Sequence, residues 1–529
     1  MSVVTIDGPA GPERTAMAAA LAARLGWRRC SLDDLFRACA AVGHRTGDRK
    51  PVPDIRLETD PTTGVSRPTF QGRPVDGLHG SDAVRAGSVA DDPQVWAAVV
   101  AEARRFVGDH DAVVEGRAAG QAFPLAVLRL HLSGPPADRG RQPEVSLRLG
   151  MVAWNTGHDP FEVTVSELHD CVAIALGRRR RHVSVVIPAR DSGNHLRLLL
   201  PRLTAAATAC DADVQIVVAD DGSIDDTAAV AAAGGAKVVS LGTSRGRSSA
   251  RNAGLQVATG DVVVFIDSDV LVEPDFLAEH LRLHAATNHT AVVGGRRHLP
   301  PGVSDPAGVA LRRDGREALL DLYSYNMACL AHPWSLAYGC NLSIDRRLLE
   351  RAAPTGFDES FAGWGLEDQE LAYRLDLHGA RFAYARAVTV AHLHHDRTMT
   401  AARFAEWKAN LRHFVDKHQD ASVLEHLVPG MDPSRAVDYS NIYREFDGGH
   451  TTAEVADLLV VRVPDTDDPV LTVQGAVTDG KNTIALVDEG DRAELAVLVE
   501  AATPGLGVRL YSGSDADRLG LVHNGPAGL

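Results

Sequence analysis

Hydrophobic and polar positions alternate along the chain in blocks, and these blocks predict where helices and strands lie. Between residues 182 and 272, four short β-branched runs (VSVVIPA, VQIVVAD, AKVVSLG and DVVVFID) alternate with longer amphipathic stretches. Short apolar runs separated by helical stretches are typical of a parallel sheet with helices on both faces. The sequence therefore predicts a doubly wound α/β domain, with ligands bound at the carboxyl ends of its strands.

The blocks also predict how the rest of the chain is organised. Residues 1–132 alternate in the same way and predict a second parallel α/β unit, whereas residues 456–511 hold short alternating runs typical of a small β-rich module. A loop-like and then helical stretch that ends in four arginines separates the two α/β parts. The predicted domains are residues 1–145, a helical connector at 146–181, a main domain at 182–430 and the β-rich module at 431–529.

The composition narrows the classes of protein. The 529 residues carry a formal net charge of −15, which argues against nucleic acid as the main partner, because phosphate backbones would be repelled. The six cysteines include no CxxC pair, and no apolar stretch reaches the ~18 residues of a membrane span. The first residues, MSVVTIDGPAGPER, lack the basic and apolar segments of a secretory signal. We therefore expect a cytoplasmic protein with neither a nucleic-acid partner nor an integral membrane segment.

Residues 8–15 read GPAGPERT and lie where a phosphate-binding loop of the form GxxxxGK[ST] would lie, between a predicted strand and a helix. Glu13 takes the position of the second glycine and would bring a negative charge to the phosphates. Arg14 takes the position of the lysine, and its planar guanidinium is not equivalent to an ammonium group. Only five of the 54 basic residues are lysines, and the first is Lys50. The loop therefore keeps the location of a phosphate site without its chemistry.

The first quarter of the chain resembles the cytidylate kinase family in three short motifs. These are IDGPAG at 6–11, GRPV at 72–75 and VVEGRAAG at 113–120, where the family has IDGPAGSGKS, GRPV and VVEGRDIG. The resemblance implies a phosphate-loop kinase fold. Because Ala118 replaces the family's nucleoside-contacting aspartate and the loop has lost its lysine, we expect an inactive domain kept for folding, docking or regulation. A working CMP-type kinase, and hence a bifunctional protein, is the alternative.

Two pairs of carboxylates follow predicted strands of the central domain. Asp220 and Asp221, in DDGS, suit hydrogen bonds to a ribose hydroxyl or a base N–H, although the same run also suits a turn. Asp267 and Asp269 end a buried strand, and paired oxygens there suit Mg²⁺ or Mn²⁺ shared with substrate phosphates. Arg251, in ARNAG, could neutralise a diphosphate, although an ordinary amphipathic helix also exposes arginines. These residues predict a site for a nucleotide and a metal at the strand ends.

The segment GWGLEDQE at 363–370 combines a tight backbone with acidic residues. Two glycines flank Trp364, so its indole is expected to face a ligand. Glu367 and Asp368 follow at the start of a predicted helix, where the positive end of the helix dipole favours ionised carboxylates. Helix capping would explain one of these acids but not the Gly-Trp-Gly that precedes them.

The motifs IPAR, DDGS, ARNAG, DSD and GWGLEDQE, in this order, resemble the family 2 glycosyltransferases with the GT-A fold, in the branch that carries a GWGxED box. The resemblance covers residues 182–420 and implies a Rossmann-like catalytic domain. It also implies a UDP-sugar donor, Mn²⁺ or Mg²⁺ as cofactor, and a single inverting displacement.

The resemblance implies roles for individual residues. Asp368 is the implied general base, with Glu367 as the less favoured candidate. His392, in VAHLHH, would join Asp269 as a metal ligand, with His394 in reserve, and Trp364 would form a platform under the sugar or acceptor. The residues implied to bind the nucleotide sugar, besides this tryptophan, are Pro188, Arg190, Asp220, Asp221, Arg251, Asp267 and Asn341.

The leading hypothesis is a metal-dependent inverting glycosyltransferase that moves a sugar from a UDP-sugar to a hydroxyl of a soluble acceptor. A small molecule such as a specialised metabolite is the preferred acceptor, and a glycan stays open. The non-enzymatic alternative is a decayed nucleotide-sugar-binding scaffold, against which the intact DSD and GWGLED motifs count. The role of the carboxy-terminal module and the formation of a homo-oligomer cannot be read from the sequence.

Overall fold

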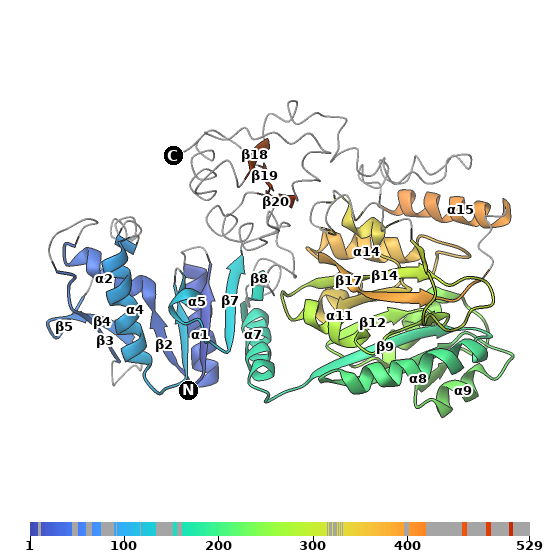
Figure 1. The fold of residues 1–529 in the computed structure, drawn as a ribbon, viewed down its shortest axis with the longest axis horizontal. Coiled ribbons are helices and arrows are strands. Elements are labelled where there is room, and N and C mark those ends of the chain that lie inside the picture. The colour runs from blue at the N-terminus through green and yellow to red at the C-terminus, as the bar shows by residue number, and fades with distance from the viewer. Residues whose placement is uncertain are drawn as a thin grey trace. The chain divides into compact units, whose positions relative to one another are not determined.

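The computed structural model of the chain (Figure 1) describes most of the first 418 residues and three short strands beyond them. The chain forms two compact units. The first consists of Met1–Pro135 with Gly150–Arg179, and the second consists of Pro136–Leu149 with Arg180–Leu529. The described residues are 1–8, 12–44, 51–59, 66–75, 89–90, 92–116, 118–133, 152–155, 161–314, 316, 320, 325, 327, 330, 332–395, 401–418, 458–462, 483–487 and 507–511.

The first unit is built on a five-stranded sheet of order β2-β6-β1-β7-β8, in which all neighbouring strands run parallel. Successive residues of β1 enter cores on opposite faces of this sheet, since Val3 packs with α2 and α4 whereas Val4 packs with α1 and α7. A separate antiparallel sheet consists of β3, β4 and β5. The elements are β1 (Val3–Asp7), α1 (Pro12–Leu25), β2 (Arg28–Ser31), α2 (Leu32–Ala41), β3 (Ile55–Thr59), β4 (Ser66–Phe70), β5 (Arg73–Pro74), α4 (Pro93–Val107), β6 (Ala112–Glu115), α5 (Ala119–Ala122), β7 (Leu128–Ser133), β8 (Val152–Asn155) and α7 (Phe161–Ala175).

The predicted parallel α/β unit is confirmed, but it takes in more of the chain than expected. Residues 146–181, predicted to be a connector, contribute β8 and α7. Strand β8 pairs in parallel with β7, and α7 packs against α1. Val165, Leu168 and Val172 of α7 are buried in the same core as α1 because they recur at helical spacing on one face. Residues 150–179 of the predicted connector therefore belong to the first unit.

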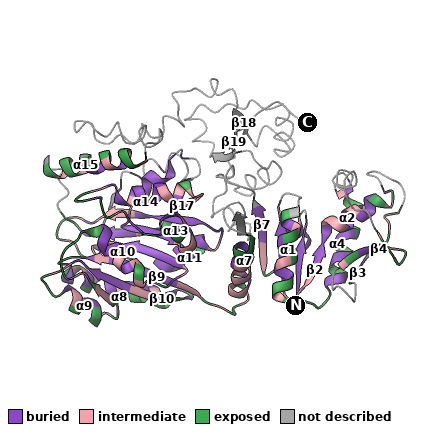
Figure 2. Cartoon of the chain, turned by 180° about the vertical axis from the view of Figure 1, so that it is seen from behind, coloured by how far each residue is buried: buried purple, intermediate pink, exposed green. Residues whose placement is uncertain are grey.

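The second unit contains a nine-stranded mixed sheet whose first half is parallel, in the order β11-β10-β9-β12. All five residues of β12 are buried, and the strands at the centre of this sheet are purple in Figure 2. This parallel half confirms the predicted α/β class. Its elements are β9 (Arg181–Ala189), α8 (Gly193–Ala209), β10 (Ala212–Asp220), α9 (Thr227–Ala233), β11 (Lys237–Ser240), α10 (Arg247–Val257) and β12 (Val262–Ile266).

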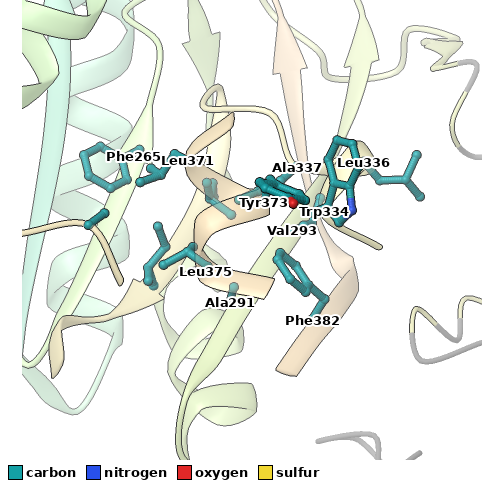
Figure 3. Close-up of a cluster of buried hydrophobic side chains, with 14 of the residues drawn as sticks. Phe265, Ala291, Val293, Trp334, Leu336, Ala337, Leu371, Tyr373, Leu375 and Phe382 are labelled. Atoms are coloured by element: carbon teal, nitrogen blue, oxygen red, sulfur yellow. The ribbon is translucent and has the colours of Figure 1, made fainter. Parts of the chain in front are cut away.

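The second half of this sheet contains antiparallel pairs and continues from β12 in the order β16-β14-β17-β13, with β15 paired to β14. Helix α14 covers it with apolar side chains; in Figure 3 Leu371, Tyr373 and Leu375 of this helix lie among residues from β12, β14 and β17. The remaining elements are β13 (Val270–Leu271), α11 (Phe276–His284), β14 (Thr290–His298), β15 (Arg312–Arg313), the 3₁₀ turn η2 (Pro333–Leu336), β16 (Asn341–Asp345), α13 (Arg346–Ala352), α14 (Glu367–Leu377), β17 (Arg381–His392) and α15 (Ala401–His418).

The carboxy-terminal part is described only as three strands, β18 (Leu458–Arg462), β19 (Thr483–Val487) and β20 (Gly507–Tyr511), which pair in parallel. Three of the five runs predicted there are thus strands, and the runs VLTVQGAV and AELAVLVEA lie outside the described residues. Among the described helices, none combines the length and the apolar character needed to cross a bilayer.

Candidate active site

The parallel strands β10, β9 and β12 are neighbours in the sheet, and the predicted motifs follow their carboxyl ends. Arg190 follows β9, Asp220 ends β10 and Asp267 follows β12. The chain leaves β9 toward β10 on one side and returns to β12 on the other, which is the point where doubly wound sheets bind ligands. The fold therefore gathers side chains that lie far apart in the sequence at one edge of the sheet.

Asp269 lies beside two histidines at this edge. Strand β13 pairs antiparallel with β17, and Val270 opposite His392 brings the preceding Asp269 next to that histidine. Nε2 of His392 is 3.5 Å from Oδ1 of Asp269, and Nδ1 of His395 is 3.1 Å from Oδ2. Burial alone would raise the pKa of Asp269, but the hydrogen bond from His395 and the nearby His392 outweigh it and hold the pKa below its usual range.

These three side chains have the composition and spacing of a divalent metal site. Their potential ligand atoms all lie within 4.8 Å of one another, and Oδ1 of Asp269 is buried without a hydrogen-bond partner among the described residues. One carboxylate and two imidazoles suit Mn²⁺, which accepts both oxygen and nitrogen ligands. The sequence predicted Asp269 and His392 and kept His394 in reserve, whereas the structure brings His395 to the aspartate. No periodic signal distinguishes these two neighbours, because β17 ends at His392.

Arg251 connects the DSD loop to the beginning of α14. Its side chain is only 3% exposed, and its Nη1 and Nη2 donate to Glu367 Oε1 and Asp267 Oδ1, each at 3.0 Å. The guanidinium also lies over the ring of Phe357, 5.1 Å from its centroid. The prediction placed Arg251 against a diphosphate; the structure instead buries it between two carboxylates. Arg247, which the sequence analysis missed, is 42% exposed and lies 3.6 Å from Glu367.

Glu367 and Asp368 differ in environment although they are adjacent. Glu367 is buried; burial opposes its ionisation, but Arg247 and Arg251 outweigh this and hold its pKa below the usual range. Asp368 is half-buried and accepts hydrogen bonds from the backbone N–H of Gly339 at 3.0 Å and of Gln369 at 2.9 Å. Burial and the negative charge of Glu367 raise the pKa of Asp368 to about 6. Such a split is typical of a pair in which one carboxylate accepts a proton near neutral pH.

The two acids of DDGS hold loops of the protein itself. Asp220 accepts from the backbone N–H of Ser223 and from the hydroxyl of Ser240. Asp221 is buried and accepts from Ser244 Oγ and from two backbone N–H groups of the loop before α10. Pro188 is half-buried in β9, and the exposed Arg190 donates to Ser244 Oγ at 2.8 Å. Of these predicted nucleotide contacts, Arg190 is the most accessible.

Trp364 lies on a loop that α15 holds from one side. Its side chain is 39% exposed, and its carbonyl and that of Gly365 accept from the side-chain amide of Asn410. The flanking Gly363 has a φ of +73°, and a Cβ added there would lie 2.7 Å from the carboxyl group of Glu406. The tight backbone predicted from the sequence is thus present, and its cause is the contact with α15, which the sequence analysis did not identify.

Asn341 lies behind the site, and its place corrects a prediction. It is buried in β16, where its Oδ1 contacts Nε2 of His280 at 3.0 Å and its Nδ2 donates to the carbonyls of Gly295 and Val388. Because both ends of the buried amide are bonded to α11, β14 and β17, Asn341 does not line a donor pocket. It holds the bulge in β14 between Gly294 and Gly295 against β17.

In the first unit, Arg14 is turned inward. Its side chain is 2% exposed; Nε donates to Glu115 at 3.2 Å, Nη1 donates to the carbonyl of Gly8 at 2.6 Å, and Nη2 is paired with Asp33. All three nitrogens of the guanidinium are thus used within the protein. Residues 9–11 of the predicted phosphate loop lie outside the described residues, and Glu13 is exposed.

Comparisons with known proteins identify both α/β parts. Residues 184–352 match the family model "Glycosyl transferase family 2", residues 330–396 match "N-terminal domain of galactosyltransferase", and residues 4–144 match "Cytidylate kinase".

Two curated proteins match different parts of the chain. Validoxylamine A glucosyltransferase of Streptomyces hygroscopicus subsp. jinggangensis is 30% identical over 260 residues, which cover 45% of this chain and 61% of that protein. The cytidylate kinase of Pseudomonas fluorescens is 29% identical over 159 residues, which cover 28% of this chain and 69% of the kinase.

A solved mannosyltransferase of Pyrobaculum calidifontis, in complex with GDP-Man and Mn²⁺, is 20% identical, with a TM-score of 0.38 over 51% of this chain and 75% of that one. The chain spans about three fifths of the length of the glucosyltransferase it matches. The match to the cytidylate kinase model thus lies in the first unit, and the match to the glycosyl transferase family 2 model lies in the second.

Proposed function

We propose that the central domain is a metal-dependent inverting glycosyltransferase that moves a sugar from a UDP-sugar to a hydroxyl group of a soluble acceptor, and that it lies within residues 182–430. The observation that carries this proposal is the cluster of Asp269, His392 and His395 at the carboxyl end of β12. Arg251 joins the same DSD loop to Asp368 through Glu367. The candidate metal site and the candidate base are thereby linked through the ion pairs of Arg251 with Asp267 and Glu367.

The residues divide the chemistry between them. Asp269, His392 and His395 would hold Mn²⁺ or Mg²⁺, which when bound neutralises charge on a departing nucleoside diphosphate. Asp368, whose pKa is raised to about 6, accepts the proton of the acceptor hydroxyl at Oδ1 or Oδ2 as that oxygen attacks the anomeric carbon. Glu367 is buried and paired with Arg251, so it raises the pKa of Asp368 and does not contact the acceptor. The exposed indole of Trp364 offers an apolar face to a sugar ring.

The experiment that tests the proposal measures hydrolysis and transfer of a panel of UDP-sugars with Mn²⁺. Wild type is expected to hydrolyse one donor slowly and to transfer it faster when an acceptor is present. Asp269→Ala is expected to lose metal-dependent activity, and Asp368→Asn is expected to lose transfer while still binding UDP with Mn²⁺. Tight binding of a UDP-sugar by wild type, without hydrolysis or transfer to any of a broad set of hydroxyl acceptors, would overturn the proposal.

We propose that the amino-terminal domain is inactive as a kinase. Arg14, in the position of the phosphate-contacting lysine, is buried and paired with Glu115 and Asp33, so it is not available to a nucleotide phosphate. The loss of the second glycine at Glu13 supports the same conclusion, since the backbone of a phosphate loop must approach the phosphates closely.

A further inference from the structure

A second charged cluster lies next to the proposed site, and it contains more positive than negative charge. Arg296 of β14 donates through Nε to Asp314 Oδ2 at 2.8 Å, and Arg316 donates through Nε to Asp314 Oδ1 at 3.1 Å. The guanidinium carbons lie 5.2 and 4.1 Å from the ring centroid of Tyr338, so both arginines share one carboxylate and one aromatic ring. Two cations therefore face a single acid among the described residues.

The donors of this cluster are incompletely used. Nη2 of Arg316 is buried and, among the described residues, has no hydrogen-bond acceptor. Nη1 of Arg296 lies 3.8 Å from the sulfur of Cys340, a weak acceptor, and the Arg296 side chain is 21% exposed. Burying an uncompensated charge is costly, and an unsatisfied guanidinium N–H adds to that cost. A bound anion would offset both, and guanidinium groups match the geometry of carboxylate and phosphate oxygens.

The cluster is connected to the proposed site on two sides. Cys340 follows Gly339, whose N–H donates to Asp368. His298 lies 4.0 Å from Asp314, and its ring centroid is 5.7 Å from that of His392. Arg296 is thus linked to the candidate base through Cys340 and Gly339, and to the candidate metal ligands through Asp314 and His298.

We propose that Arg296 and Arg316, with Tyr338 as an aromatic wall, form a subsite for an oxyanion group, a carboxylate or a phosphate, carried by the acceptor. That the bound group belongs to the acceptor rests on the proposed glycosyl transfer. That the subsite binds an anion does not depend on it. The subsite narrows the acceptor class to hydroxylated molecules that carry a negative charge.

The test titrates the full-length chain, free of divalent metal, with inorganic phosphate and separately with acetate, at ionic strength matched with chloride. Wild type is expected to bind at least one of them saturably, and the tighter of the two identifies the group. Arg296→Gln should weaken binding about tenfold or more, because it removes charge-assisted hydrogen bonds. Arg297→Gln is the matched control, since alternation along β14 turns that side chain to the other face of the sheet.

If Arg296→Gln does not fold, Arg296→Lys keeps the charge beside Asp314 but loses the planar fork, and it should still bind the anion several-fold more weakly than wild type. Equal binding by wild type and the Arg296 variants, or no saturable binding by wild type, would overturn the subsite. Because the titration needs no donor, failure of the UDP-sugar assay with intact anion binding would count against the glycosyl transfer alone.

Discussion

At the scale of single residues, the site separates two adjacent carboxylates by giving them different neighbours. Glu367 is buried beside Arg251 and near Arg247, and these cations favour its ionised form. Asp368 has only backbone N–H groups as hydrogen-bond donors, and the charge of Glu367 opposes its ionisation. The surroundings therefore favour the ionised form of one carboxylate and the protonated form of the next.

The first prediction concerns the pH dependence of transfer. Asp368 must be ionised to accept a proton and its pKa is raised to about 6, so kcat/KM for transfer should fall as the pH drops below about 6. Glu367→Gln removes the negative charge beside Asp368 and lowers the pKa of Asp368. The fall of kcat/KM at acidic pH should therefore begin at a lower pH in this variant. Asp368→Asn should reduce transfer by roughly 10²–10⁴-fold. An acidic limb that stays in place in Glu367→Gln would contradict the proposed coupling.

The second prediction distinguishes two neighbouring histidines as metal ligands. Nδ1 of His395 lies 3.1 Å from Asp269, whereas His394 does not belong to the described cluster of potential ligands, so His395→Ala should weaken Mn²⁺ binding and His394→Ala should leave it unchanged. We expect a loss of about tenfold or more for His395→Ala, since even partners outside the ligand shell contribute that much. Titration of free Mn²⁺ followed by electron paramagnetic resonance measures this without an acceptor. Equal affinities of the two variants would count against His395.

At the scale of elements, α15 fixes the loop that carries Trp364. Asn410 donates to two carbonyls of this loop, and Lys417 pairs with Asp358 before it and with Glu370 of α14, each at 2.7 Å. Helix α15 thus contacts both this loop and α14, whose second residue is the candidate base Asp368. Any shift of α15 would be transmitted to the indole and to α14 together.

The third prediction tests this contact through a glycine. Gly363→Ala places a methyl group against Glu406 at a φ of +73°, whereas Gly302→Ala meets nothing within 4 Å at a φ of +77°. Each variant should lose about 1–2 kcal/mol of unfolding free energy from the left-handed backbone alone. Gly363→Ala should lose somewhat more, because the carboxyl end of Glu406 must move away from the new methyl group, and urea denaturation measures the difference. Equal losses would show that the Glu406 side chain does not confine residue 363.

The local sequence pattern could predict those site residues that directly follow a strand. Asp267 and Asp269 follow a wholly buried strand, so an apolar run that ends in acids was enough to find them. The inward direction of Arg251 was not predictable, because its partner Glu367 is 116 residues away in the chain. The prediction for Asn341 was wrong for a related reason. Its partners come from α11, β14 and β17, and the periodicity of the sequence does not indicate contacts between such distant elements.

At the scale of the whole molecule, the chain joins two parallel α/β parts, and in the first of them Arg14 is paired with Glu115 and Asp33. The fold class of both α/β parts could be predicted, since each alternates strands and helices over more than a hundred residues. Their boundary could not, because β8 belongs to the first sheet only through pairing with β7. The sequence before β8, SGPPADRGRQPE, has no hydrophobic pattern that would predict another strand of the same sheet.

The fourth prediction concerns which nucleotide the whole chain binds. UDP with Mn²⁺ should raise the Tm of the full-length protein, by an amount equivalent to about 2.7 kcal/mol at a hundred times its dissociation constant. ATP or CMP with Mg²⁺ should leave the Tm unchanged, because Arg14 is occupied by Glu115 and Asp33. A saturable shift with ATP that disappears in Arg14→Ala would show that the amino-terminal domain still binds nucleotides.

Gly339 connects two requirements that a survey of sequence variants would otherwise treat separately. Its N–H holds Asp368, and a Cβ at this position would lie 2.8 Å from the guanidinium carbon of Arg251. The constraint is one of volume, so even alanine would displace the arginine and shift the amide at the same time. In a saturation library, position 339 should therefore tolerate no replacement when transfer is selected, and natural variants that lack this glycine would need a rebuilt proton acceptor.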